Sequence, residues 1–208
     1  MRILVKLSIL LLLVTAISVP QVSAAENLAI PASPYNVLEG IGNKLFSRIA
    51  ANQQEIKKFP QLMQVIVEEE LMPSIDYRYA SYRILGKHLR KTSKDQRAKF
   101  VDSMRSNLVR TYASALMQYK NQQVVFEPEK PINGKKIVAV KTQIIDVNKP
   151  TINVVFKMRQ NKKTGKWKAF DMVVEGISLL SSKKAELSKR IAKRGVEQVT
   201  VELAALIK

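Results

Sequence analysis

The sequence predicts an α+β domain in which several helices cover one face of a curved four-stranded antiparallel sheet. Two observations carry this prediction. Residues 36–119 repeat apolar side chains every three or four positions, the period of amphipathic helices, whereas residues 122–174 alternate with the period of two that is typical of strands. Helical spacing then returns after residue 180. These layers permit an apolar cavity between the sheet and the helices but do not require one.

Residues 1–24 have the organisation of a cleaved secretory signal peptide. Arg2 and Lys6 supply a positive start, residues 7–19 are an apolar run, and a small-residue Val-Ser-Ala cleavage site follows. The run is shorter than the about 20 apolar residues that a membrane-spanning helix needs. We therefore expect an exported, soluble protein whose mature part, residues 25–208, folds as a single domain.

The chain has no cysteine and a formal net charge of +18 at pH 7. The missing cysteines exclude a lipid-modified N-terminal cysteine, a disulfide framework and a thiolate metal site. In a cytosolic protein such a positive charge indicates nucleic acid as a partner. In an exported protein it favours membrane surfaces or acidic proteins, although any single lysine also fits a solvated helix face.

Three helices are expected in the first part of the mature chain. Helical spacing runs through residues 36–57. A second helix over residues 62–72 stops at Pro73, because the residue before a proline avoids the helical conformation. Either Ser74 or Asp76 then caps a third helix, which has an apolar face rich in tyrosine.

A long fourth helix is expected to begin after Ser93. Ser93 and Gln96 form a capping box, in which each side chain satisfies a free backbone N–H of the other residue. The apolar residues of this helix form one continuous stripe, which by itself indicates burial in a core rather than a ligand site. The stripe consists of Phe100, Val101, Met104, Leu108, Tyr112, Ala115, Leu116 and Tyr119.

The change to a period of two predicts four strands, at residues 122–126, 136–145, 151–160 and 166–174. The connections between them are short and turn-like, so neighbouring strands should be antiparallel. One face of the sheet is expected to be apolar and the other to be wet. Two helices, separated by Gly195, should complete the fold.

The segment from Trp167 to Leu180, WKAFDMVVEGISLL, reads as a strand that passes without a proper turn into an apolar exit at Gly176. A thin surface loop would not expose this many large apolar side chains around one glycine, so they must line a core or a cavity. Strict alternation gives the strand two faces, with Trp167, Ala169, Asp171 and Val173 on one and Lys168, Phe170, Met172 and Val174 on the other.

Motifs spread in order through the whole mature chain form a recognisable set. They are the segment 167–180, Asp76-Tyr77-Arg78-Tyr79-Ala80 with Ile84-Leu85-Gly86, Gln96-Arg97 with Phe100, Tyr112, Leu116 and Tyr119, Val140 with Ile144-Ile145-Asp146, Arg159 with Thr164-Gly165-Lys166-Trp167, and Gly195-Val196 with Leu203. Together they resemble the MlaC-type periplasmic phospholipid-binding proteins, also called the toluene-tolerance family. The sequence departs from the family pattern at Lys87-His88, where an aromatic residue is expected after the Leu-Gly step.

The resemblance implies a non-enzymatic periplasmic carrier that buries the acyl chains of a diacyl phospholipid in a cavity between sheet and helices. It further implies that the carrier shuttles lipid between an outer-membrane lipoprotein–porin complex and an inner-membrane ABC transporter with a lipid-binding ring subunit, which maintains outer-membrane lipid asymmetry. A monomer is expected, although the sequence itself does not determine the oligomeric state. Phospholipid is then cargo, and no cofactor, metal or nucleic acid is expected. About thirty methylenes in bare water cost on the order of 20 kcal/mol, so a carrier must offer its own apolar wall.

Candidate site residues follow from the apolar pattern and the resemblance together. Ile177 is the sharpest choice, because it follows the Gly176 bend, and an acid there should destroy lipid retention while sparing the fold. Each wall residue fits a dry core equally well. The expected wall consists of Leu85, Met104, Leu108, Tyr112, Val140, Ile144, Val154, Phe156, Met172, Val174 and Ile177. The cations expected at the mouth, near a headgroup phosphate, are Arg83, Lys87 and Arg97.

An enzyme is not expected from these residues. His88 is the single histidine, and the chain has neither a cysteine nor a Gly-x-Ser-x-Gly elbow. Asp171 and Glu175 straddle a strand end, where Asp171 is expected to bond a strand edge or a helix start. The alternative function is a non-enzymatic basic adaptor of the cell envelope with a solid core and no lipid. The sequence does not predict the direction of transport, the preferred headgroup and acyl chains, or the number of lipids bound.

Overall fold

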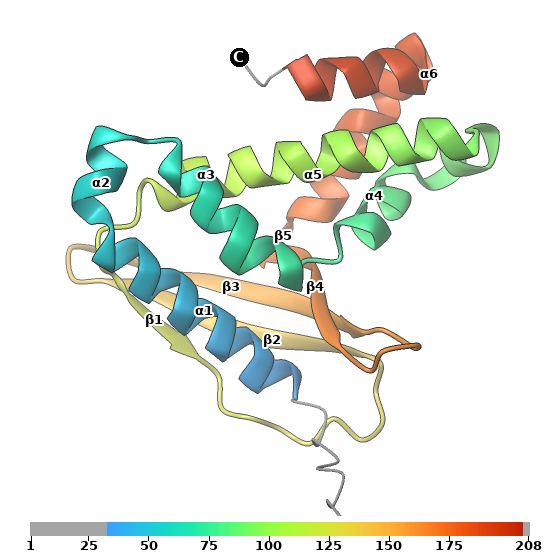
Figure 1. The fold of residues 1–208 in the computed structure, drawn as a ribbon. Helices are drawn as coiled ribbons and strands as arrows, with labels where there is room; N and C mark the ends of the chain where they lie inside the picture. The colour runs from blue at the N-terminus through green and yellow to red at the C-terminus, as the bar shows by residue number, and fades with distance from the viewer. Residues whose placement is uncertain (1–32, 206–208) are drawn as a thin grey trace, which may run out of the picture. The chain divides into compact units, whose positions relative to one another are not determined.

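The computed structural model describes residues 33–205, which form a layer of strands and a layer of helices (Figure 1). The expected signal peptide, residues 1–24, lies outside the described residues. The helices are α1 (Pro34–Ala51), α2 (Gln53–Lys58), α3 (Leu62–Ile66), α4 (Tyr77–Leu85), α5 (Lys94–Leu116) and α6 (Leu179–Ala205). The strands are β1 (Gln123–Phe126), β2 (Ile137–Asp146), β3 (Lys149–Gln160), β4 (Trp167–Val174) and β5 (Ile177–Ser178). The predicted α+β class is confirmed.

The strands form one sheet in the order β1-β2-β3-β4-β5, and every neighbouring pair is antiparallel. The four expected strands are present, and β5 adds a short fifth. It forms because Glu175 and Gly176 have φ values of 47° and 82°, and a two-residue hairpin turn of type I′ needs two such positive values. The turn pairs Val174 with Ile177. The expected exit from β4 without a proper turn is therefore wrong.

A β-bulge at Phe170 interrupts the alternation of β4. Ala169 and Asp171 pair with consecutive residues of β3, which leaves Phe170 as the extra residue. At this point the backbone N–H of Asp76 donates to the carbonyl of Ala169 over 2.7 Å, so the chain before α4 lies along the edge of β4. The bulge places Ala169 on the same face as Met172, and the expected strict alternation through this strand is wrong.

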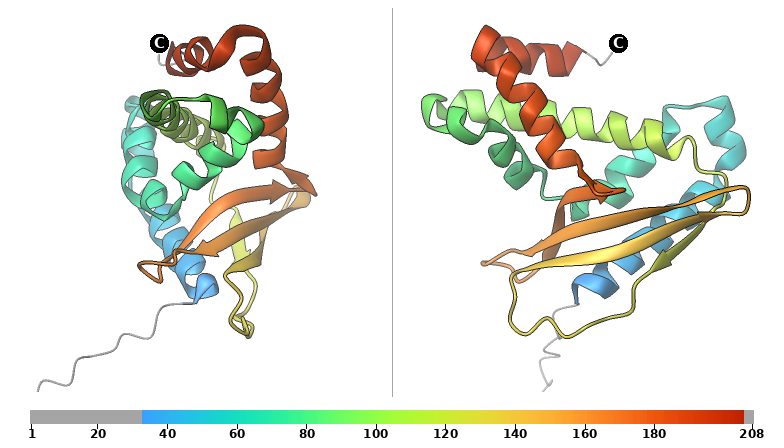
Figure 2. Two further views of the ribbon diagram at one scale, coloured as in Figure 1. Left: turned by 90° about the vertical axis from the view of Figure 1, so that its right-hand side faces the viewer. Right: turned by 180° about the vertical axis from the view of Figure 1, so that it is seen from behind.

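The helices divide into a group that covers the sheet and a group that packs on other helices. α1 packs on β2 and β4 and runs across one face of the sheet (Figure 1). α6 continues from β5, leads away from the sheet and packs on α4 and α5 (Figure 2). Two short links lie between these elements: a π-helix with a 3-10 turn over residues 67–74, and a 3-10 helix at Gly86–Lys91.

Buried apolar side chains form two separate clusters, and α5 contributes to both. Phe100 and Met104, near its start, belong to one, whereas Tyr112 and Leu116 pack against the other. The helix cluster consists of Ile84, Leu85, Phe100, Met104, Leu187, Ile191, Val199 and Leu203. The sheet cluster consists of Tyr35, Leu38, Leu45, Ile49, Ile56, Met63, Ile66, Val67, Met72, Ile75, Val109, Ala113, Val138, Val140, Met158, Trp167 and Ala169.

The ends of the helices follow their local sequence signals closely. In the capping box, the Ser93 hydroxyl accepts from the Gln96 N–H at 3.1 Å, and the Gln96 side chain accepts from the Ser93 N–H at 2.9 Å. Asp76, not Ser74, caps α4, since its carboxylate accepts from the third residue of that helix at 3.1 Å. Gly195, at φ 79°, divides α6 into the two expected helices. The helix expected over residues 36–57 is instead split into α1 and α2.

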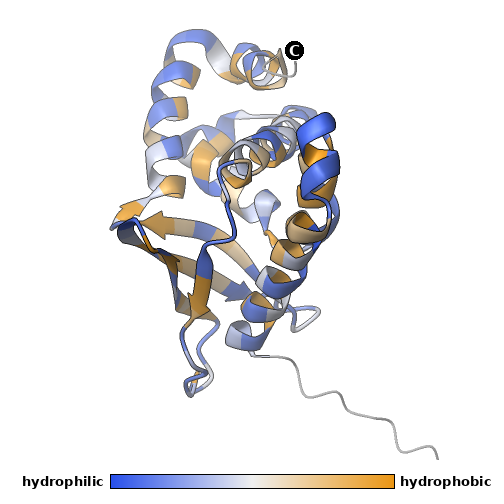
Figure 3. Ribbon diagram, turned by 90° about the vertical axis from the view of Figure 1, so that its left-hand side faces the viewer, coloured by the Kyte–Doolittle hydropathy of each residue, from blue (hydrophilic) through white to orange (hydrophobic). Residues whose placement is uncertain are grey.

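Apolar and hydrophilic residues alternate along the ribbons of both layers, as amphipathic elements around a shared interior require (Figure 3). The alternation is regular in β2, where Val138, Val140 and Thr142 are buried while the residues between them are exposed. Within residues 33–205, no helix combines the length and the apolar character needed to cross a membrane.

Candidate binding cavity

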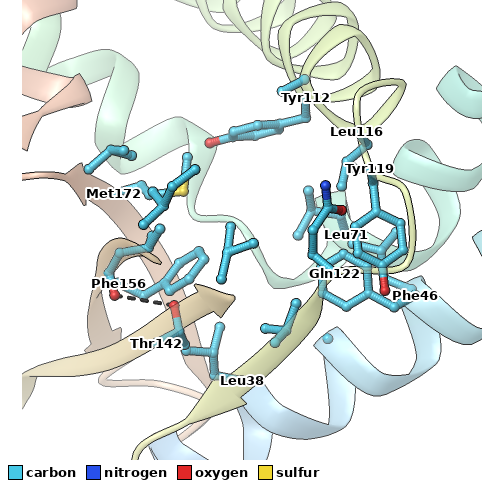
Figure 4. A pocket seen from close by; sticks show the side chains of 18 of the residues that line it. Leu38, Phe46, Leu71, Tyr112, Leu116, Tyr119, Gln122, Thr142, Phe156 and Met172 are labelled. Atoms are coloured by element: carbon cyan, nitrogen blue, oxygen red, sulfur yellow. Dashed lines mark hydrogen bonds between the residues drawn. The ribbon is translucent and has the colours of Figure 1, made fainter. Parts of the chain in front are cut away.

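A cavity of about 450 Å³ lies between the sheet and the helices that cover it (Figure 4). Strands β1 to β4 supply its floor, while α1 and the end of α5 supply its walls. Leu71 and Ile75, from the segment that joins α3 to α4, complete the lining. The volume falls in the range of about 300–1,000 Å³ that is typical of small-molecule sites. Most lining side chains are apolar, so the cavity suits hydrocarbon.

The floor of the cavity follows from the register of the strands. Residues paired across an antiparallel sheet present their side chains on the same face. Phe126 pairs with Thr142, Thr142 with Val154, and Val154 with Val174. All four line the cavity. Thr142 is the polar member of this row, and its hydroxyl donates to the Val154 carbonyl at 3.2 Å, which leaves the row without a free donor.

The α1 wall approaches the sheet very closely at one point. Leu38, Gly42 and Leu45 lie on one face of α1, as the spacing of three and four residues requires, and all three line the cavity. A Cβ atom at Gly42 would lie 2.4 Å from the tip of the Phe126 ring. Glycine therefore lets the ring of Phe126 rest against α1, and a larger residue would force the ring to shift.

Ion pairs fix α1 to the π-helix rather than to the cavity. Glu70 is paired with Lys44 at 2.8 Å and with Arg48 at 2.5 Å, and Arg48 also pairs with Glu69 at 2.5 Å. Hydrogen bonds from Lys44 and Arg48 hold the pKa of Glu70 below its usual value. The carboxylate therefore stays charged at neutral pH, and its ion pairs hold α1 against the π-helix.

α5 and the residues that follow it contribute three large side chains to the wall, two of them tyrosines. Tyr112, Leu116 and Tyr119 line the cavity, and the ring of Tyr119 packs on that of Phe46 with 4.6 Å between centroids. Figure 4 shows the Tyr112 hydroxyl pointing away from α5 toward the Met172 side of the cavity. Burial, with a smaller effect of the negative charge on Asp171, raises the pKa of Tyr112 to about 12. The hydroxyl is therefore neutral at physiological pH.

Asp171 is a structural carboxylate. It accepts from the Ser178 hydroxyl at 2.8 Å and from the Leu180 N–H at 3.0 Å, and it pairs with the Lys157 ammonium at 3.0 Å. These contacts anchor the start of α6 to β4, so the expected bond to a helix start is confirmed. A carboxylate with its oxygens so engaged serves packing rather than proton transfer.

The charged and amide groups that line the cavity gather near the β2–β3 turn, with the exception of Asp171. Gln118, Gln122, Asp146 and Lys149 all line this end. A polar surface hollow adjoins it and shares Gln122, Asp146 and Lys149 with the cavity. The cavity is thus apolar along most of its length and opens into a polar hollow, an arrangement that matches an amphiphilic ligand.

Six of the eleven residues expected in the wall line this cavity, and four lie in dry packing. Val140 is fully buried in the sheet cluster, and Leu108 packs against that cluster. Leu85 and Met104 lie in the helix cluster, because the stripe of α5 turns toward α4 and α6 before it reaches the sheet. The six lining residues are Tyr112, Ile144, Val154, Phe156, Met172 and Val174.

The eleventh expected wall residue, Ile177, and the three cations expected at the mouth lie outside the lining. Ile177 is 63% exposed, because the hairpin turn carries it past Val174 to the end of the sheet row. Arg83 and Lys87 belong to α4 and the following 3-10 helix, away from the cavity lining. Arg97 donates to the hydroxyl and the carbonyl of Thr92, at 3.1 and 2.7 Å. The polar opening is at the β2–β3 turn instead.

Residues that sequence reasoning missed include Gly42, Phe126 and Lys149. Ile41 and Leu45 follow the helical period of α1 and line the cavity, but a period does not reveal a contact with a strand eighty residues away. Lys149 follows a turn and looks like one of many solvated lysines. Among residues 33–205, no group of three or more histidine and carboxylate side chains is placed to hold a metal ion.

Comparisons of the sequence and of the fold relate this chain to known proteins. The model of the MlaC protein family matches residues 39–205 of the chain. The intermembrane phospholipid transport system binding protein MlaC of Haemophilus influenzae is 32% identical over 197 residues, which cover 94% of this chain and 90% of the relative. Toluene tolerance protein ttg2D of Pseudomonas putida is 26% identical over 148 residues, which cover 71% of this chain and 67% of the relative.

A solved structure shares the fold. The phospholipid-binding protein from Ralstonia solanacearum, determined in complex with a phospholipid, superposes with a TM-score of 0.74 at 21% sequence identity. The match covers 84% of this chain and 98% of that protein. The arrangement of a curved sheet under helices is therefore common to both chains.

Proposed function

This chain belongs to the MlaC protein family, and we propose that it is a periplasmic carrier that holds a diacyl phospholipid with its acyl chains in the cavity. The observation that carries the proposal is the polarity of the site: an apolar interior of about 450 Å³ opens into a hollow lined by Asp146, Lys149 and amide side chains. This is the distribution that a molecule with hydrocarbon tails and a charged headgroup requires.

The energetics of lipid transfer explain why a cavity of this kind is needed. Each methylene that leaves a bilayer for water costs about 0.8 kcal/mol, so bare acyl chains do not cross an aqueous space at a useful rate. Side chains such as Ile144, Val154 and Phe156 replace the bilayer with contacts that have no direction. Chains of different length and saturation then fit the same wall.

The proposal extends to the place of the carrier between two membranes. The relative from Haemophilus influenzae is named for intermembrane phospholipid transport. We propose that residues 1–24 direct export and are removed, and that the mature domain, residues 25–208, exchanges lipid with an outer-membrane lipoprotein–porin complex and an inner-membrane ABC transporter. Outer-membrane lipid asymmetry would depend on this exchange. Its direction is set by the relative affinities of donor and acceptor.

Organic extraction of the natively purified protein, followed by mass spectrometry, tests the proposal. Stoichiometric phospholipid is the expected result, together with uptake of phospholipid from vesicles after the protein has been delipidated. Turnover of a soluble ester substrate serves as the control, and none is expected of a carrier. An empty extract from folded protein that also fails to take up lipid would favour the alternative, a basic adaptor with a solid core. The cavity is the observation that favours the carrier.

A further inference from the structure

Two opposite charges face each other where the apolar cavity meets the polar hollow. Asp146 and Lys149 are paired across the β2–β3 turn, whose two central residues are Val147 and Asn148. Both line the cavity as well as the hollow. Their side chains therefore border the junction between the cavity and the hollow.

Neither charge is consumed by the fold. Asp146 accepts from the Asn148 N–H at 3.0 Å and from the Gln122 amide at 3.4 Å. These hydrogen bonds come first among the causes that hold its pKa below the usual value, and the nearby ammonium groups of Lys149 and Lys120 act in the same direction. A carboxylate accepts about four hydrogen bonds, so Asp146 retains free capacity. Among residues 33–205, no ion pair within 4.0 Å engages Asp146 or Lys149.

The second lysine stands on the outer side of the same opening. Lys120 is exposed and lines the hollow but not the cavity, together with Asn121 and Gln123. The hollow thus offers two ammonium groups and one carboxylate within a small area. A phosphodiester carries one negative charge and accepts several hydrogen bonds, which suits the two lysines. The carboxylate remains as a partner for a cation.

We propose that this opening recognises a zwitterionic phospholipid headgroup, with Lys149 and Lys120 beside the phosphate and Asp146 beside the terminal amine. The inference rests on the proposed carrier function and names its preferred cargo class. A headgroup with no cation, such as phosphoglycerol, leaves Asp146 next to a net negative ligand. Lys120 and Lys149 are exposed and Asp146 is half-buried. Near water, one pair of charges about 4 Å apart changes the affinity by only a modest factor.

A competition experiment tests the preference. Delipidated protein is mixed with vesicles of equal parts phosphatidylethanolamine and phosphatidylglycerol, recovered, and extracted for mass spectrometry. Wild-type protein should be enriched in phosphatidylethanolamine relative to the vesicles. Asp146→Asn keeps the acceptor for the Asn148 N–H and should lower the ratio of the two lipids about fivefold, which corresponds to about 1 kcal/mol. Glu39→Gln is the control, because it also removes one negative charge but lies on the exposed face of α1, outside the cavity lining. It should leave the ratio unchanged.

The lysine variant supplies a second, independent readout. Lys149→Gln removes a phosphate partner, which both lipids share, so it should lower the total lipid recovered while the ratio changes less than in Asp146→Asn. Loaded Asp146→Asn protein with the wild-type ratio would overturn the headgroup inference and leave the carrier function intact. Wild-type protein that recovers neither lipid would instead contradict the carrier function itself.

Discussion

The helix cluster and the sheet cluster share one helix, α5, but the cavity is lined by residues of the sheet cluster and by none of the helix cluster. Leu85, Phe100 and Leu187 are fully buried where α4, α5 and α6 close on one another. About three helical turns further along α5, Tyr112 and Leu116 face a space that lies between α5 and α1 above the sheet. An apolar stripe therefore determines which side chains leave water, while the neighbouring elements determine whether those side chains meet each other.

Truncation of a methionine in each cluster should give the largest difference between them. Met104→Ala removes a side chain that is 1% exposed in the helix cluster, and should lower the free energy of unfolding by about 2–5 kcal/mol. Met172→Ala acts on a side chain that borders the cavity, which makes fewer contacts, and should cost about 1 kcal/mol. Urea unfolding of the delipidated proteins measures both. Equal losses would show that the cavity is filled by side chains in solution.

An acid in the cavity should affect lipid more than folding. Ile144→Glu places a carboxylate in the apolar floor and should reduce bound phospholipid at least about tenfold. Ile177→Glu should retain lipid within about twofold, since Ile177 is 63% exposed and its charge stays in water. This replaces the sequence-based expectation that an acid at Ile177 destroys retention. Extraction and mass spectrometry give the result, and Val201→Glu, 60% exposed on α6, is the matched control.

A loss of lipid that is as large for Ile177→Glu as for Ile144→Glu would place the β4–β5 hairpin in the path of the acyl chains. Far-UV circular dichroism of each variant separates such a loss from unfolding. The comparison then distinguishes the floor of the cavity from its rim, which a single variant does not.

The contact between Gly42 and Phe126 gives a smaller effect whose sign depends on the partner. Gly42→Ala adds a methyl carbon that would lie 2.4 Å from the tip of the Phe126 ring. This overlap should destabilise the protein by about 1–3 kcal/mol. In a Phe126→Ala background the same change should stabilise it by up to about 1 kcal/mol, because alanine favours a helix over glycine. Thermal unfolding of the four proteins in this cycle measures the coupling. Additive effects would mean that the ring does not rest on α1.

Much of the fold was predictable from local sequence, because its signals act over a few residues. Ser93 and Gln96 fixed the start of α5, Gly195 divided α6, and the alternation in β2 and β3 identified the apolar face of the sheet. The β-bulge was not predictable in this way. It depends on the chain before α4 bonding to Ala169, and no period within β4 reveals that contact.

The candidate site was predictable only in part, for a related reason. Val154, Phe156 and Val174 were expected in the wall because strand alternation assigns a face, and that face is the floor of the cavity. Leu85 and Met104 have the same apolar character but belong to helix packing, and hydrophobicity does not separate the two environments. The cations expected at the mouth, Arg83, Lys87 and Arg97, do not line the cavity, whereas Lys149 does. Only its position in space distinguishes Lys149 from the other lysines.

The smallest expected effects are two pH dependences of stability. One arises in α6 at acidic pH, and the other arises in the cavity at alkaline pH. Glu202 in α6 accepts from Arg190 at 2.5 Å and from Arg194 at 2.8 Å, and these bonds lower its pKa to about 2. Its contribution is complete above the ordinary pKa of a glutamate, about 4.3, and is lost as the pH falls toward 2. The melting temperatures of wild type and Glu202→Gln should therefore differ at pH 7 and converge near pH 2. A difference that persists at pH 2 would exclude these ion pairs as its source.

The cavity should respond at alkaline pH instead. Burial first, and the charge of Asp171 second, raise the pKa of Tyr112 to about 12, whereas an unfolded tyrosine titrates near about 10. The unfolded chain therefore loses its proton first, and stability falls as the pH rises from 10 toward 12. Tyr112→Phe has no proton to lose, so its melting temperature should decline less steeply than that of wild type over this interval. Parallel declines would mean that the phenol is solvated, and that water rather than hydrocarbon fills this side of the cavity.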